Sequence, residues 1–125
     1  MTEYFTGRSI SLEDAVTMAD QIIVGRLVET GHADVGAPGQ TYYDHAAAEI
    51  ARWLSGAPPL SKRPHSVTFA YTVQSIPQEE REIAPAVGET YILFLKDEQG
   101  APRAIKILPG DQPNVTKVEQ LLPHQ

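Results

Sequence analysis

A near-continuous apolar run at residues 90–95 constrains the fold more than any other segment. It has the sequence TYILFL, with a Gly-Glu turn before it and a turn-forming segment at residues 97–100 after it. Such a run is typical of a central strand that is covered on both faces. Residues 103–108 follow the turn and are expected to form the partner strand of a hairpin. The sequence therefore predicts a sheet with this hairpin in it.

Two further segments have the pattern of strands. Residues 66–74 alternate large apolar residues with small or polar ones, which indicates a strand with one buried face. Residues 22–30 are apolar and rich in β-branched residues, and Gly25 within them indicates a bulge or a close backbone contact. The stretches at residues 31–40 and 55–65 are rich in glycine or proline and are predicted to be loops.

Helices are predicted on either side of the strands. Ser11 is expected to cap a helix over residues 12–20, because its hydroxyl can accept a hydrogen bond from a first-turn N–H, and Asp14 stands at the capping-box position. Pro109-Gly110 ends the last strand, and Asn114 is predicted to cap a second short helix. The residues of that helix expected to face the core are Val115, Val118, Leu121 and Leu122.

Residues 42–54 support two interpretations. Their composition favours a helix, and Ala46, Ile50 and Trp53 fall on one helical face. Alternation favours a strand, because apolar residues share one parity at Tyr42, Ala46, Ala48, Ile50 and Leu54. On residue pattern alone the helix is preferred, since alanine is depleted in strands.

Length, charge and composition limit the class of protein. A chain of 125 residues predicts a single domain over residues 1–125, with a core at about 11–108 and a C-terminal extension at 109–125. The absence of cysteine excludes disulfides and thiolate-ligated metals. A net charge of −6, with Lys62-Arg63 the only adjacent bases, disfavours nucleic acid as a partner.

The sequence leaves the cellular location open. No segment predicts a membrane span, and the first eight residues lack the basic region and apolar core of a signal peptide. As written, the chain is expected to be cytoplasmic. If it is the trimmed mature form of a longer chain, it is expected to be exported.

Three segments together carry a family resemblance. They are ADQIIVGRLV at residues 19–28, WLSG at residues 53–56 and GETYILFL at residues 88–95. They resemble the helix-strand unit, the strand-ending corner and a later strand of small bacterial OB-like barrels of the netrin-like type, the type of the metalloproteinase-inhibitor barrel. Ser55 stands where lysine is typical of the corner.

The resemblance covers roughly residues 11–108 and bears on fold more than on function. It implies a mainly β (α+β) fold, a five-stranded OB/netrin-like barrel with a short N-terminal helix. The residue pattern after residue 110 adds a predicted short C-terminal helix to this fold. The resemblance also implies that residues 43–54 form a strand, which we adopt. The inhibitors chelate a metal with an N-terminal cysteine, and this chain has none.

Residues with catalytic chemistry are sparse. The four histidines are His32, His45, His65 and His124. The chain contains no HExxH pair, no GxSxG elbow and no glycine-rich phosphate loop. We therefore predict no catalytic residue, no cofactor and no metal site. The alternative is a metal-dependent or hydrolytic site built by loops from His32, Asp34, Asp44 and His45.

The candidate partner-binding residues are two tyrosines and three acids. Tyr42 and Tyr43 are amphipathic aromatics of the kind enriched at interfaces, whereas Trp53 is expected to pack in the core. The connection at residues 77–87 holds Glu79, Glu80 and Glu82, which are either a solvated segment or an acidic edge that steers a basic partner.

Together these observations predict a non-catalytic module that binds or inhibits another protein. A second alternative is an OB-type binder of oligosaccharides or single-stranded nucleic acid that uses Tyr42, Tyr43 and Arg52.

Overall fold

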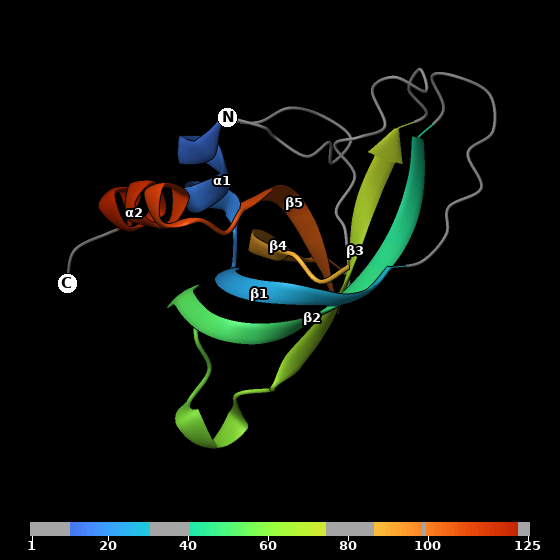
Figure 1. Ribbon diagram of the computed structural model, residues 1–125, viewed down its shortest axis with the longest axis horizontal. Coiled ribbons are helices and arrows are strands. Elements are labelled where there is room, and N and C mark those ends of the chain that lie inside the picture. Colours follow the sequence, from blue (N-terminus) through green and yellow to red (C-terminus); the bar gives the residue numbers. More distant parts are fainter. Residues whose placement is uncertain (1–10, 31–40, 75–86, 99, 123–125) are drawn as a thin grey trace.

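Five strands close into a barrel in the computed structural model, which describes residues 11–30, 41–74, 87–98 and 100–122 (Figure 1). The strands are β1 (Gln21–Thr30), β2 (Thr41–Ser55), β3 (Ser66–Gln74), β4 (Thr90–Glu98) and β5 (Ala101–Pro109). Their order around the barrel is β1-β2-β3-β5-β4, and only the β3–β5 pair is parallel. The predicted mainly β fold is confirmed, and the barrel is consistent with an OB-like small barrel.

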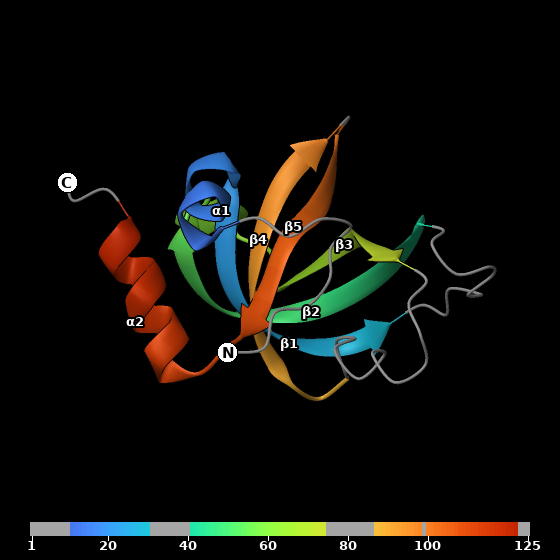
Figure 2. The same cartoon turned by 90° about the horizontal axis from the view of Figure 1, so that it is seen from above.

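Two α-helices and one 3₁₀ turn complete the described chain. Helix α1 (Leu12–Met18) precedes β1, α2 (Gln112–Leu121) follows β5, and η1 (Leu60–Lys62) lies between β2 and β3. The two α-helices lie on the same side of the barrel, and η1 projects from the opposite side of β1 and β2 (Figures 1 and 2). None of the helices in the described ranges is long and apolar enough to span a bilayer.

Helix α1 begins as predicted. The Ser11 hydroxyl accepts a hydrogen bond from the Asp14 N–H at 3.1 Å, which satisfies one of the unpaired donors of the first turn. The helix ends at Met18 rather than at residue 20, because Ala19 has an extended backbone (φ −70°, ψ 136°) that leads into β1.

Strand β2 resolves the ambiguity of residues 42–54. It is 15 residues long and pairs with β1 along one edge and with β3 along the other. Ala46 and Ala48 point into the barrel and are 3% and 0% exposed. The side chain of Glu49, the next residue of β2, is exposed to solvent. The helix preferred from residue pattern alone is wrong, and the strand implied by the resemblance is confirmed. Pairing on two edges satisfies the backbone groups that a helix would satisfy internally, so tertiary context overrides alanine's preference.

Gly25 lies close to the backbone of β2, as its position in a strand suggested. A β-carbon built on it would lie 3.0 Å from the Glu49 carbonyl oxygen on β2. The pairing of β1 with β2 also shifts register between Val24 and Gly25. A side chain at position 25 would therefore be crowded by the backbone of β2, which would have to shift slightly to accommodate it.

Apolar side chains pack in two layers that β4 separates. The interior cluster fills the barrel and includes Ile23, Leu27, Phe69, Tyr91, Leu93, Leu95 and Ile107. The outer cluster lies between the helices and the outer face of three strands, and includes Ala15, Ile22, Val24, Ile92, Phe94, Leu108, Val115 and Val118. Residues 91–95 are all buried because successive side chains enter opposite layers. The predicted central strand, covered on both faces, is confirmed.

The cap of α2 differs from the prediction. Asp111, and not Asn114, is the capping residue, and its carboxylate accepts a hydrogen bond from the Asn114 N–H at 3.0 Å. Asn114 is buried, and its Nδ2 donates to the Pro109 carbonyl at 2.9 Å.

The apolar face of α2 is narrower than predicted. Val115 and Val118 are buried in the outer cluster, and Leu122 packs against it. Leu121 is 39% exposed, so the expectation that it faces the core is wrong. It lies at the last position of the helix, where the chain turns away into an extended conformation at Leu122.

Candidate functional site

The predicted partner-binding residues fall only partly within the described chain. Glu79, Glu80 and Glu82 lie outside the described residues. Tyr42 and Tyr43 belong to β2, where their backbones pair with Val73 and Thr72 of β3. The structure describes the backbone of these two tyrosines and not their side chains, so their role in binding stays a prediction.

The alternative His/Asp site is likewise only partly described. His32 and Asp34 lie outside the described residues, whereas Asp44 and His45 are consecutive in β2 and His45 is exposed. Within the ranges that the structure covers, no three His, Cys, Asp or Glu side chains are grouped closely enough to hold a metal ion. The structure therefore does not test the four-residue site, which stays a prediction.

Arg52 and Trp53 have structural contacts. The Arg52 guanidinium forms an ion pair with Glu119 at 3.0 Å, which links β2 to α2. Trp53 is half-buried and packs against the interior cluster, which confirms the expectation of core packing. Arg52, which the OB-type alternative assigned to ligand binding, thus forms an ion pair within the fold.

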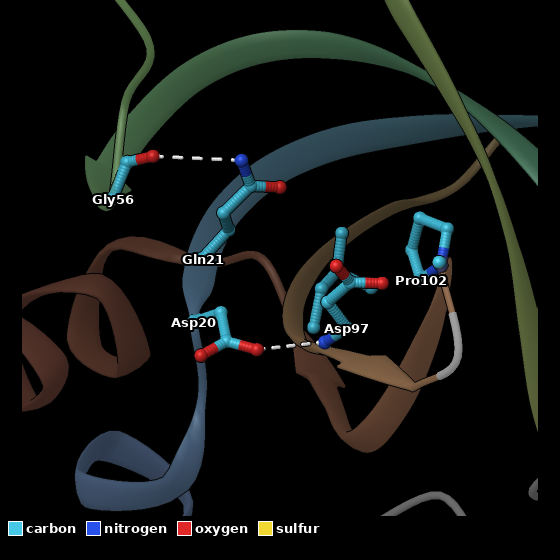
Figure 3. Close-up of a pocket in the computed structure, with 7 residues that line it drawn as sticks. Asp20, Gln21, Gly56, Asp97 and Pro102 are labelled. Atoms are coloured by element: carbon cyan, nitrogen blue, oxygen red, sulfur yellow. Dashed lines mark hydrogen bonds between the residues drawn. The ribbon is translucent and has the colours of Figure 1, made fainter.

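A polar pocket lies where the start of β1 meets the ends of β2 and β4 (Figure 3). Its volume is about 580 Å³, and the residues that line this corner pocket are Asp20, Gln21, Gly56, Leu95, Asp97, Gly100 and Pro102. Two aspartates line a mainly polar opening, because Leu95 is 2% exposed and packs in the interior cluster, which leaves Pro102 as the apolar side chain at its surface. The corner pocket therefore offers negative charge beside a small apolar surface.

Asp20 links the start of β1 to β4 by two hydrogen bonds. Its Oδ2 accepts a hydrogen bond from the Asp97 N–H at 2.7 Å, and its own N–H donates to the Leu95 carbonyl at 2.8 Å. On the other side, Gln21 Nε2 donates to the Gly56 carbonyl at 3.5 Å. The Asp97 carboxylate has no ion-pair partner within the described ranges. Asp20 is thus structural, and Asp97 is the acid of the pocket that is available to a ligand.

Gly56 closes the same corner from β2. It has a positive φ of 72°, and a β-carbon built on it would overlap the Asp20 carbonyl oxygen and lie 3.1 Å from Gln21 Cα. Only glycine meets both requirements. The segments at residues 19–28 and 53–56 that carry the family resemblance therefore touch at this corner.

The loop at residues 56–65 leaves from this corner and carries the most exposed large apolar side chain of the described chain. Leu60 is 81% exposed at the start of η1. Lys62, Arg63 and His65 beside it are exposed as well. The loop contains no acidic residue, although the chain as a whole has a net charge of −6. The 56–65 loop is thus an apolar tip with basic flanks on an acidic protein.

Hydrogen bonds hold the 56–65 loop in one shape. Arg63 Nε donates to the Pro58 carbonyl at 2.7 Å, and the Lys62 N–H donates to the Pro59 carbonyl at 2.8 Å. At its base, the Ile50 N–H donates to the His65 carbonyl at 2.9 Å. Prolines at three of its positions restrict the backbone further. These bonds support the backbone of the loop on which Leu60 is exposed.

Sequence reasoning did not single out Leu60. The available signal was a lone leucine between Pro58-Pro59 and Lys62-Arg63 in a predicted loop. No family model and no curated protein matches this sequence. The 56–65 loop and the corner pocket are the two surface features of the described chain that offer chemistry for binding.

Proposed function

We propose that this chain is a non-catalytic protein-binding module that contacts its partner through the 56–65 loop. The observation that carries the proposal is Leu60, which is 81% exposed at the tip of a loop held by its own hydrogen bonds. Burying a leucine side chain contributes about 1.5–3 kcal/mol, which this fold leaves unused. A partner with an apolar recess would gain that contribution.

The shape of the loop favours binding. Association costs free energy when mobile side chains and loops are ordered at an interface. The bonds from Arg63 to Pro58 and from Lys62 to Pro59 are already formed in the free protein. A preformed loop of this kind binds with a smaller entropic cost than a flexible one.

The charge of the loop indicates the kind of partner. Lys62 and Arg63 are exposed and form no ion pair within the described residues. Flanking charges steer encounter with a surface of opposite sign and contribute to selectivity. The partner surface is therefore expected to be acidic around an apolar recess.

The netrin-like assignment belongs to the same proposal. It is supported by the helix before β1, by the five-stranded closed barrel, and by the contact between Asp20 and Gly56 from two of the resembling segments. Netrin-like barrels of the inhibitor type act on other proteins, which agrees with a binding role.

Photo-crosslinking tests the proposal. A photoreactive phenylalanine analogue replaces Leu60 in one variant and Leu121 in a control, and both are activated in cells of the native source. We expect discrete adducts with another protein from position 60 and none of the same mass from position 121. Adding Lys62→Glu and Arg63→Glu is expected to abolish the adducts. The absence of adducts specific to position 60 would contradict the proposal.

A further inference from the structure

The 56–65 loop and the corner pocket carry opposite charges. The loop offers one leucine and two cations, Lys62 and Arg63. The pocket offers the exposed Asp97 carboxylate beside Pro102, within a volume of about 580 Å³. The loop supplies the cations and the pocket supplies the carboxylate.

The two features are also neighbours on the surface. Gly56 lines the pocket and is the first residue of the loop, so the loop leaves from the rim of the pocket (Figure 3). Two adjacent patches that complement each other are compatible with a two-fold axis. Such an axis can set the loop of each copy opposite the pocket of the other copy. One rotation would then form both contacts at once.

We infer that a second copy of this chain occupies the corner pocket, with the 56–65 loop of each copy seated at the pocket of the other. Leu60 lies at the rim of the pocket beside Pro102. Lys62 and Arg63 pair with the Asp97 carboxylate at the rim. The inference shares the loop with the proposed function but does not depend on a foreign partner.

The charged residues next to Asp97 do not occupy its carboxylate. Lys96 adjoins Asp97 in β4, but consecutive strand residues face opposite sides, and its Nζ donates to the Met18 carbonyl at 3.5 Å. Asp20 is engaged by the Asp97 N–H through one carboxylate oxygen. Asp97 is therefore the residue at which the contact is best tested.

The expected dimer is weak. One loop and one pocket on each copy bury less surface than a stable dimer needs, and the remaining charge of both copies is negative. We expect a dissociation constant on the order of 100 µM at low salt. It should weaken at about 0.5 M salt, where ion pairs at a surface are screened.

Sedimentation equilibrium of the full chain, from about 10 µM to about 1 mM, measures this association. A reversed loop (Lys62→Glu with Arg63→Glu) and a reversed pocket (Asp97→Lys) are each expected to weaken dimerisation at least about tenfold. Lys117→Glu changes an exposed cation on α2 and is the matched control, expected to leave the dissociation constant unchanged.

Mixing the two reversed variants is the decisive measurement. In their heterodimer each loop again meets a pocket of opposite charge, so a 1:1 mixture should associate although neither variant does so alone. Monomer at every concentration, or a dimer that ignores both reversals, would overturn the inference. A monomer that still gives adducts with another protein from position 60 overturns the dimer alone. A dimer without such adducts overturns the proposed partner alone.

Discussion

Gly56 lies so close to the main-chain carbonyl of Asp20 that no side chain fits between them. This contact joins the end of β2 to the start of β1, and it sets the base of the 56–65 loop beside the corner pocket. The two residues are thus a packing contact of the barrel and the boundary between its two candidate binding features.

The first prediction concerns Gly56. Gly56→Ala adds a β-carbon that overlaps the Asp20 carbonyl and imposes a positive φ on alanine. We expect a loss of more than about 3 kcal/mol in the free energy of unfolding, measured by urea denaturation. Gly100→Ala is the control, because Gly100 has a φ of 84° but no heavy atom within 4 Å of its added β-carbon. Its cost should be about 1–2 kcal/mol. Equal losses would contradict the proposed contact.

The second prediction concerns the hydrogen bond of Asp20. Asp20→Ala removes the acceptor of the 2.7 Å bond from the Asp97 N–H and should cost about 1–2 kcal/mol of stability. Asp97→Ala keeps that N–H and should cost less than about 0.5 kcal/mol. Thermal unfolding of the two variants under one condition separates these roles. A larger loss for Asp97→Ala would mean that its carboxylate, and not that of Asp20, stabilises the corner.

The third prediction concerns the small side chains of β2. Ala48 is 0% exposed within the interior cluster, so Ala48→Leu forces added volume into a filled barrel. We expect a loss of about 1–3 kcal/mol in urea denaturation. Ala51 is exposed on the same strand, and Ala51→Leu should change stability by less than about 0.5 kcal/mol. A tolerated Ala48→Leu would show that the barrel has unfilled space at this position.

The fourth prediction concerns the start of α2. Asp111→Ala should cost about 1 kcal/mol, and Asp111→Ser should restore most of it, because serine also accepts a hydrogen bond from a first-turn N–H. Asn114→Ser should not be tolerated in the same way, because the shorter side chain cannot maintain the 2.9 Å bond to the Pro109 carbonyl. If Asn114→Ser were tolerated in thermal unfolding and Asp111→Ser were not, Asn114 and not Asp111 would be the cap.

The strands were predictable where their residues have one clear period. Residues 66–74 and 90–95 alternate or form a continuous apolar run, and both are strands of nearly the predicted extent. Residues 42–54 were not predictable from their own composition. Their alanines face large residues on neighbouring strands, and that fit appears only once Phe69 and Leu27 are in place around Ala46 and Ala48.

Local chemistry explains the misplaced cap of α2. Asp111 and Asn114 are both residues that cap helices, and Asn114 directly precedes the predicted apolar face. Pro113 was the cue for the correct choice, since proline favours the first turn of a helix and therefore places the cap before it.

The candidate site depends on contacts between distant parts of the chain. Asp20 and Gly56 meet only through the pairing of β1 with β2, which residue pattern does not specify. The exposure of Leu60 was equally hidden, because a leucine in a loop is as consistent with a covered position as with an open one.

The outer cluster has a consequence for synthesis of the protein. Ala15 of α1 shares this cluster with Val115 and Val118 of α2, which lie about 100 residues later in the chain. At the usual translation rate of about 5–20 residues per second, α2 is synthesised roughly 5–20 s after α1. Nascent chains therefore expose Ile22 and Val24 on the outer face of β1 during this interval, and we expect them to be recognised by ribosome-associated chaperones until α2 emerges.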